Sequence, residues 1–323
     1  MGGALLALTG IAFWQTFQSV PSDDPITAAL FRDVRTGGAG LALGRLAEMT
    51  AGDTLLNANR HVYAHAIGRF ALRQRNWDPR TFADCTPQFQ SGCYHGVIEA
   101  FVAHAPESST FRELCDQISG PRTTEVELRE CAHGLGHGLW IRVSGAYRSA
   151  LAQCDELAGS ISQEECRNGV FMQQSGAAHA HAGSNAHNHM PSLKCNREPN
   201  RYRTACWHYE GRLHVLAAGY PKAFSTCEGA REYVAVCYWG LGKWIGGTAG
   251  TDEQIIELCQ QARLVGSCIA GAAEYLMDEN WRTERAEGLC KASPAAAKTA
   301  CFAKVEERKA ILNSTAPSRT DRS

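Results

Sequence analysis

Two histidines four residues apart, His133 and His137, are the clearest candidates for chemistry in this sequence. They lie in the stretch Cys131-Ala-His-Gly-Leu-Gly-His-Gly-Leu-Trp140. On an α-helix, residues four apart lie on one face at adjacent turns, so both imidazoles would face one metal ion. His61 and His65 repeat this spacing, which is typical of zinc and other transition-metal sites. The spacing therefore predicts a metal site, although it does not identify a reaction.

Both histidine pairs belong to a frame that recurs along the chain, two and six residues after a cysteine. A copy without a cysteine, at residues 61–65, lies 34 residues before the next copy. Corresponding positions of stacked repeats face the same side, so we expect these side chains to line one patch. The predicted ligands are His61, His65, His95, Glu99, His133 and His137, with His208 from a later copy as a further candidate.

The predicted patch contains more ligands than one metal ion requires. Five imidazoles and a carboxylate exceed the four ligands of a tetrahedral zinc ion. They could hold two ions, or one ion beside an acid/base group, and Glu99 would then be either a ligand or the catalytic base. Copper, zinc and iron all accept imidazole ligands, so the metal is not identified. The alternative is that these polar residues form hydrogen bonds at helix ends and bind no metal.

A second group of histidines lies in a segment rich in Gly, Ala and Asn, at residues 177–190. This segment belongs to the longest repeat and is interpreted as an insertion. Such tracts bind copper, zinc or nickel loosely, and this one could load the main site or cover it as a lid. A solvated loop without a metal is the alternative. The candidate ligands here are His179, His181, His187 and His189.

The cysteines predict the elements that position these histidines. Fourteen cysteines form seven sequence-adjacent pairs, and the second members of successive pairs are separated by 38, 35, 40, 31, 31 and 33 residues. A period near 34 residues is typical of two-helix repeats. The predicted disulfides are Cys85–Cys93, Cys115–Cys131, Cys154–Cys166, Cys195–Cys206, Cys227–Cys237, Cys259–Cys268 and Cys290–Cys301.

Helical patterns surround these pairs. Phe111, Leu114, Cys115 and Ile118 follow helical spacing, and Thr251 precedes an acidic first turn as an N-cap would. Each unit is therefore predicted to be a helix, a turn and a second helix, joined by its disulfide. A glycine three residues after most second cysteines would let helices approach closely. We predict an all-α fold of about eight disulfide-linked αα-hairpins over residues 21–312, forming an α-solenoid or an α/α toroid.

The spacing Cys85-x7-Cys93-x2-Gly96 resembles that of the cysteine-rich Sel1-like repeats, which are TPR-like helical hairpins carrying a disulfide. The likeness covers residues 85–301. It implies an interaction scaffold whose concave face holds a protein or a small-molecule ligand, and it implies no catalytic residue.

Composition bounds the location and the partners of the protein. The formal net charge is -1, and basic and acidic residues are interspersed along the chain. This pattern excludes the basic patch that nucleic-acid binding requires. No CxxC motif occurs, so the many cysteines favour disulfides in an oxidising compartment over zinc or iron–sulfur sites. The apolar start predicts a signal peptide or a membrane signal anchor at residues 1–20, with a buried first helix as the alternative. Residues 313–323 are predicted to be a disordered tail.

Two functions follow from the sequence. The first is an exported metalloenzyme with oxidative chemistry, whose histidines bind one or two metal ions. Export would make it periplasmic, secreted or membrane-anchored. The second is a non-catalytic exported scaffold or metal-binding protein.

Overall fold

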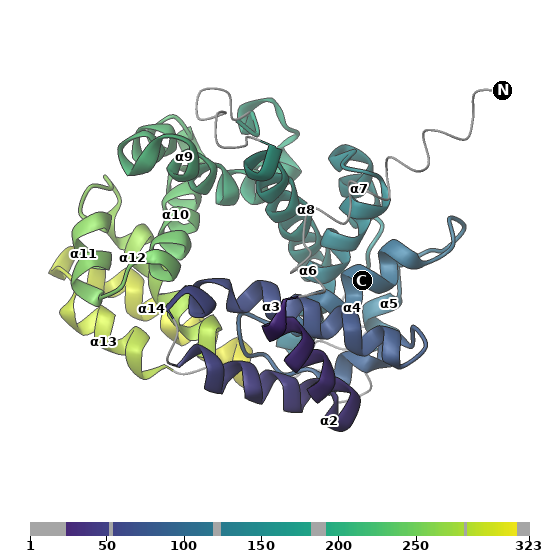
Figure 1. The fold of residues 1–323 in the computed structure, drawn as a ribbon. Coiled ribbons are helices and arrows are strands. Elements are labelled where there is room, and N and C mark those ends of the chain that lie inside the picture. The colour runs from purple at the N-terminus through teal and green to yellow at the C-terminus, as the bar shows by residue number, and fades with distance from the viewer. Residues whose placement is uncertain (1–23, 52–53, 119–123, 182–191, 281–282, 315–323) are drawn as a thin grey trace. The chain divides into compact units, whose positions relative to one another are not determined.

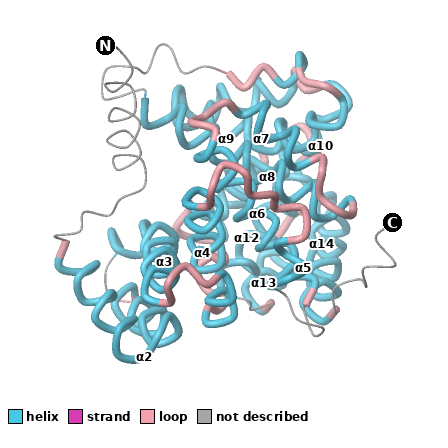
Figure 2. Tube along the Cα trace, turned by 90° about the vertical axis from the view of Figure 1, so that its right-hand side faces the viewer, coloured by secondary structure: helices cyan, strands magenta, loops and turns pink. Residues whose placement is uncertain are grey.

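The structure, a computed structural model, describes residues 24–51, 54–118, 124–181, 192–280 and 283–314. Within these ranges the regular elements are helices and there is no strand (Figure 2), which confirms the all-α prediction. The helices are α2 (Pro25–Thr50), α3 (Thr54–Gln74), α4 (Gly92–His104), α5 (Leu114–Ile118), α6 (Glu125–Arg142), α7 (Tyr147–Cys154), α8 (Ser160–His181), α9 (Asn200–Glu228), α10 (Val234–Thr248), α11 (Asp252–Cys259), α12 (Val265–Asn280), α13 (Glu284–Ala292) and α14 (Ala295–Asn313), with short 3-10 turns η1 (Pro79–Asp84), η2 (Cys195–Arg197) and η3 (Arg231–Tyr233).

The chain divides into two compact units. Unit 1 comprises residues 1–123, 127–170 and 318–323, and unit 2 comprises residues 124–126 and 171–317. In unit 1, α2 packs on α3 and α3 packs on α4; in unit 2, α9, α10, α12 and α14 pack in chain order (Figure 1). Helices that follow one another in the repeat are thus neighbours within each unit. A solenoid or toroid made of both units stays a prediction.

All seven predicted disulfides are formed. Their Cα–Cα distances lie between 5.3 and 5.7 Å, which is within the usual range. In each pair the second cysteine lies in the first two turns of its helix. The capping prediction at Thr251 is also confirmed, because its side chain accepts from the Gln254 amide and Gln254 returns the bond.

The first cysteine does not always end an α-helix, which corrects the prediction. Cys85 follows η1 and Cys195 begins η2, both 3-10 turns. Lys194, directly before Cys195, has a φ of 54°, so a right-handed helix cannot enter Cys195 from the preceding residues. In addition, α9 serves two hairpins. It contains Cys206 and Cys227, and it breaks between them at Gly219, where φ is 80°, just before Pro221.

The glycine after the second cysteine brings helix backbones into contact, as predicted. A Cβ atom built on Gly96 would lie 2.2 Å from the carbonyl oxygen of His65 on the neighbouring helix. Equivalent contacts of 2.1, 1.8 and 2.0 Å face Gly169, Gly240 and Gly271. Distances this short leave no room for a side chain at these four glycines. Successive second helices therefore pack backbone to backbone at the level of the recurring frame.

Replacing Gly96 with alanine is expected to destabilise unit 1, because α4 must move away from α3. Overpacking of this kind costs roughly 1–3 kcal/mol in the free energy of unfolding. Gly288→Ala is the matched control, since nothing lies within 4 Å of its added Cβ and alanine favours a helix. Chemical denaturation of both variants tests this, and equal stability of the two would contradict the close packing.

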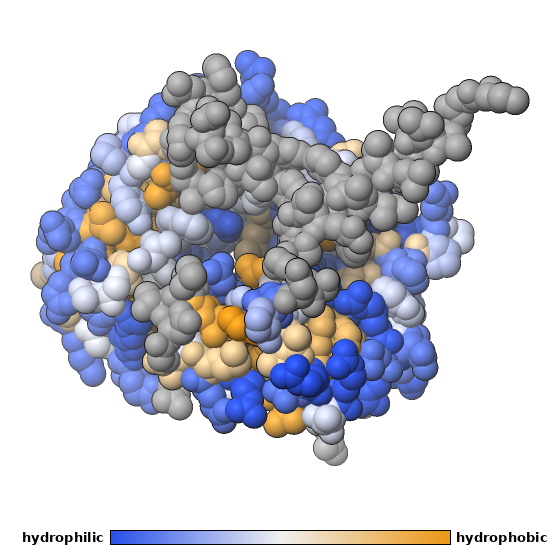
Figure 3. Space-filling view, in the orientation of Figure 1, coloured by the Kyte–Doolittle hydropathy of each residue, from blue (hydrophilic) through white to orange (hydrophobic). Residues whose placement is uncertain are grey.

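The core is built by apolar faces of these helices. Leu30, Leu43 and Leu46 of α2 are fully buried, whereas Leu41 and Val62 are the exposed large apolar side chains among the described residues. Hydrophilic colours cover much of the described surface in the view of Figure 3.

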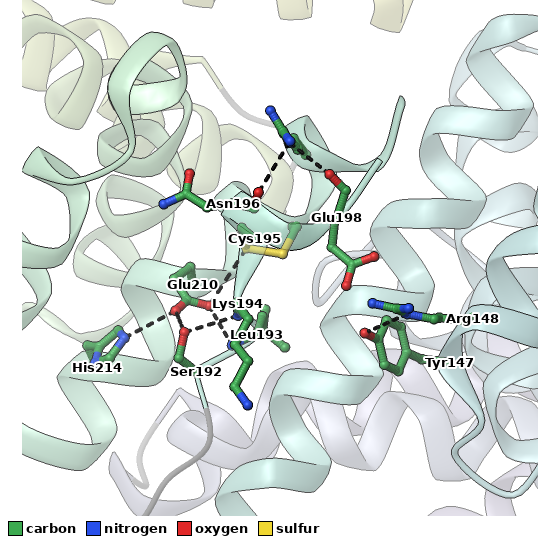
Figure 4. Close-up of a disulfide and its surroundings, with 12 residues drawn as sticks. Tyr147, Arg148, Ser192, Leu193, Lys194, Cys195, Asn196, Glu198, Glu210 and His214 are labelled. Atoms are coloured by element: carbon green, nitrogen blue, oxygen red, sulfur yellow. Dashed lines mark hydrogen bonds and ion pairs between the residues drawn. A yellow bond between two sulfur atoms is a disulfide. The ribbon is translucent and has the colours of Figure 1, made fainter. Parts of the chain in front are cut away.

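The residues that follow the predicted insertion, Ser192 and Leu193, are fastened to α9 by Glu210 (Figure 4). The buried Glu210 carboxylate accepts hydrogen bonds from the Leu193 amide at 2.8 Å, from the Ser192 hydroxyl, and from His214 Nε2 at 3.3 Å. Its neighbour in the figure is the Cys195–Cys206 disulfide. The insertion itself is described only at its start, where α8 runs through His181; His187 and His189 lie outside the described residues.

The predicted signal segment at residues 1–20 also lies outside the described residues. Among the helices that are described, none combines the length and the apolar character needed to cross a bilayer. Helix α14 extends through Asn313, the first residue of the predicted tail, and residues 315–323 are not described.

Candidate metal centre

Three neighbouring helices of unit 1 bring the predicted histidines together. Helix α3 supplies His61 and His65, α4 supplies His95, and α6 supplies His133 and His137. The ring centroids of contacting pairs lie between 4.6 and 5.8 Å apart. The shared register of the repeat frame therefore does place these imidazoles on one patch.

Two groups within this patch have nitrogen atoms close enough for one metal ion. In each group the candidate ligand atoms all lie within 4.8 Å of one another. The first group is His61, His65 and His95; the second is His95, His133 and His137. His95 belongs to both, which makes it the central residue of the patch.

Glycines of α6 bring its histidines to α4. A Cβ on Gly134 would lie 3.1 Å from the Cα of His95, and one on Gly138 would lie 2.9 Å from the carbonyl oxygen of Glu99. The helix that carries His133 and His137 therefore rests on the backbone of the helix that carries His95. Gly134 and Gly138, each directly after a histidine of this motif, are the reason that its imidazoles reach the patch.

Hydrogen bonds fix the proton positions of His61 and His65. His61 Nδ1 lies 2.8 Å from the carbonyl oxygen of Phe89, so it must donate. His65 Nδ1 lies 3.1 Å from Glu99 Oε2 and likewise donates to this carboxylate. We assign both protons from these acceptors. Neutral imidazole carries only one N–H, so the Nε2 atom of each ring has a bare lone pair.

These two lone pairs converge. His61 Nε2 and His65 Nε2 are 3.1 Å apart, and in the neutral forms of both rings neither nitrogen has a proton to donate to the other. Two acceptors at this distance repel unless a cation lies beside both. Metal–nitrogen bonds of about 2.0–2.1 Å place two cis ligands roughly 2.9–3.4 Å apart, which matches the observed separation. The contact thus has the geometry of two ligands of one ion.

His95 is oriented from its other side. Its Nε2 donates to Glu130 Oε2 at 2.7 Å, while its buried Nδ1 has no hydrogen-bond partner among the described residues. In metal sites, a carboxylate commonly holds one nitrogen of a histidine while the other nitrogen binds the metal. His95 therefore offers Nδ1, whereas His61 and His65 offer Nε2.

The loop before α4 is shaped to receive His61. Phe89, Gln90 and Ser91 have φ angles of 56°, 55° and 60°, a left-handed conformation that non-glycine residues rarely adopt. This run aims the Phe89 carbonyl at His61, and Gly92 follows it in contact with the same ring. Backbone in such conformations concentrates at functional sites, where surrounding structure holds it.

Searches of protein-family models, curated proteins and solved structures found no match for this chain. The function is therefore argued from the geometry of this centre.

Glu99 belongs to neither nitrogen group, although it was predicted as a ligand or base. One of its oxygens accepts from His65, and the other accepts from the Arg69 guanidinium. The fully buried carboxylate thus holds His65 in place, and its direct binding of a metal stays a prediction. Arg69 lies one turn after His65 on α3, so its i+4 spacing was the signal available in the sequence.

Burial disfavours the charged forms of His61 and His95. It lowers the pKa of His61 to about 3, with repulsion from His65 adding to the effect. Burial, followed by repulsion from His133 and His65, holds the pKa of His95 well below its usual value. Burial opposes the ionisation of Glu99, but its interactions with His65 and Arg69 are stronger and lower its pKa. At neutral pH His61 and His95 therefore offer lone pairs to a cation, and the neighbouring Glu99 carboxylate is ionised.

The other predicted ligands lie elsewhere. His208 is in unit 2, where its ring packs against Trp239 with centroids 4.2 Å apart, and it belongs to neither nitrogen group. His179 and His181 fall at the end of α8. Their roles as ligands stay predictions.

Proposed function

We propose that this protein binds a transition-metal ion through His61 Nε2, His65 Nε2 and His95 Nδ1, with His133 and His137 forming a second, weaker position. The observation that carries the proposal is the 3.1 Å distance between the two Nε2 atoms, in rings that each donate from Nδ1 to an oxygen acceptor. A neutral imidazole that donates from one nitrogen has one lone pair, so His95 can bind only one metal ion at a time. We assign it to the first group, and it could bind an ion of the second group only by leaving the first. The second position then depends mainly on His133 and His137.

Charge around the centre supports a divalent ion. The carboxylates of Glu99 and Glu130 are hydrogen-bonded to two of the three first-group histidines, His65 and His95. Arg69 offsets part of that negative charge. Imidazole ligands suit zinc, copper, iron and nickel, whereas magnesium and calcium prefer oxygen. Zinc or copper in an all-imidazole set is the expected occupant.

Three protein ligands leave an open coordination position, which is typical of catalytic rather than structural sites. His61 and His133 are partly exposed, so solvent reaches the patch at these two residues. We propose that the ion carries out oxidative chemistry on a small molecule that enters there. The alternative is a metal-binding protein without catalytic activity. Substrate turnover by the metal-loaded protein would distinguish the enzyme from this alternative.

The seven disulfides indicate that the protein works in an oxidising, extracytoplasmic compartment. Export to such a compartment fits the predicted signal segment. Periplasmic, secreted and anchored forms all meet this condition.

The experiment is metal titration of the purified full chain, first stripped with chelator and then loaded with Zn²⁺ or Cu²⁺. One ion per chain should bind tightly. His61→Ala/His65→Ala should lower that affinity at least 100-fold, while His104→Ala should leave it unchanged. His104 is a suitable control because it stacks on Trp77 outside the patch. Tight binding retained by the double variant would refute the proposed site.

A further inference from the structure

Unit 2 uses the same repeat frame for a different purpose. The positions two and six residues after its cysteines carry His208 and Arg212 on α9, Trp239 and Lys243 on α10, and Glu274 on α12. The backbones of these helices touch, because Gly240 meets the His208 carbonyl and Gly271 meets the Trp239 carbonyl. The frame positions of unit 2 therefore also converge on one patch.

Most charges of this patch are paired. Lys243 Nζ lies 3.1 Å from Glu274 Oε1 and 3.2 Å from Asp278 Oδ2. Trp239 Nε1 donates to Glu274 Oε2 at 2.8 Å, and Arg308 donates to Asp278. Lys304 lies over the Trp239 ring, 5.3 Å from its centroid. Glu274 and Asp278 thus face three cations.

Arg212 is the charge that this network leaves without a carboxylate. Its guanidinium lies 5.0 Å from the centroid of the Trp244 ring, and its Nε is buried with no hydrogen-bond partner within the described ranges. The ionisable groups that act on it most are two tyrosines, Tyr209 and Tyr275, rather than an acid. A buried guanidinium without a counter-ion is costly.

His208 is unsatisfied in the same place. The residue is only 7% exposed, and no hydrogen bond joins its ring nitrogens to another described residue. It lies one turn before Arg212 on α9 and therefore on the same face. Lys243 and Arg212 are among the charges that act on it most strongly. Two donors on one helix face, next to a lysine, thus lack an acceptor.

We propose that His208, Arg212 and Lys243 form a binding site for a small oxyanion, a carboxylate or a phosphate group, distinct from the metal centre of unit 1. The anion would accept paired hydrogen bonds from the planar Arg212 guanidinium and one from the neutral His208 ring. Lys243, partly exposed, would add a point charge at the solvent side. The proposal does not depend on metal binding.

The aromatic surroundings bear on the molecule that carries the anion. Trp239 packs against His208, and Trp244 lies beneath Arg212. A ligand that joins an oxyanion to a flat apolar group would contact these rings while its charge meets Arg212. An aromatic carboxylate should therefore bind more tightly than acetate.

The test is calorimetric titration of the full chain with inorganic phosphate, acetate and benzoate in the presence of chelator, so that metal binding plays no part. We expect saturable binding of at least one of these probes. Binding of phosphate alone identifies a phosphate site, and binding of acetate or benzoate identifies a carboxylate site. Failure of all three probes to saturate overturns the proposal.

Variants locate the site. Arg212→Met should weaken binding at least tenfold, whereas Arg285→Met, which removes an exposed arginine paired with Asp252, should leave it unchanged. Equal weakening by both changes would show general charge attraction and would overturn the proposal. Because Arg212 is partly buried and its loss could perturb packing, His208→Phe provides a second variant that keeps the ring packing and removes the donor. The anion should raise the thermal midpoint of the wild-type protein but not that of either patch variant.

Discussion

Replacing His95 with alanine is expected to abolish high-affinity metal binding at the first position. His95 is the residue shared by both nitrogen groups, and its Nδ1 is the buried lone pair that Glu130 orients. Loss of one of three imidazoles from the first group should lower its affinity by at least two orders of magnitude. Zinc or copper content after dialysis measures this effect.

The variants on either side of His95 should separate the two positions. His133→Ala should lower the total metal content while the first ion remains bound, because His61, His65 and His95 are untouched. His61→Ala should instead weaken the first position, while the second position keeps His133 and His137. His104→Ala again serves as the control for loss of an imidazole. Identical results for His61→Ala and His133→Ala would contradict two separable positions and would indicate one ion held by all three helices.

Removing Glu274 is expected to give the largest loss of stability in unit 2. Its carboxylate accepts from Trp239 and pairs with Lys243, and its side chain is only 7% exposed. Taking one partner from a buried ion pair typically costs about 3–5 kcal/mol, because the remaining charge stays buried without compensation. Glu287→Ala is the control, since the Glu287–Lys309 pair lies at the surface and should contribute less than about 1 kcal/mol. Denaturant unfolding compares the two, and similar losses would contradict the buried network.

The same carboxylate makes stability depend on pH. Burial opposes the ionisation of Glu274, but Lys243, Arg308 and Lys304 outweigh burial and lower its pKa below the ordinary value of 4.5. A group whose pKa is lower in the folded state stabilises the protein above its unfolded pKa. This contribution should be complete at neutral pH and should decline as pH falls below 4.5. Glu274→Gln should flatten that part of the stability profile, and an unchanged profile would contradict the assignment.

The sequence predicted the elements well where covalent spacing determines the structure. The seven cysteine pairs, the all-α fold and the backbone contact at Gly96 and Gly271 follow from a repeat period and from residue size. The convergence of His61, His65, His95, His133 and His137 followed from their common register.

The sequence did not predict the partners that orient the ligands. The Phe89 carbonyl reaches His61 through three consecutive left-handed residues, and no residue type at positions 89–91 requires that conformation. Glu130 precedes a cysteine and lies outside the two frame positions, so its approach to His95 depends on the rotation of α6 relative to α4. Gly219 and Pro221, which let α9 serve two hairpins, look like an ordinary turn signal in the sequence. These features depend on how helices meet rather than on the period.

The Cys85–Cys93 disulfide spans the loop that carries the Phe89 carbonyl. A reduced chain would leave that loop unclosed, and His61 would lose the acceptor that determines its proton position. Folding and metal loading of this protein would then occur in a fixed order: export, cysteine oxidation and only afterwards capture of the ion. A newly made chain in a reducing cytoplasm would not compete for cellular zinc or copper through its first histidine group, and the metal would be acquired where the mature protein works. Loading the chain with zinc before and after selective reduction of this bond checks that order.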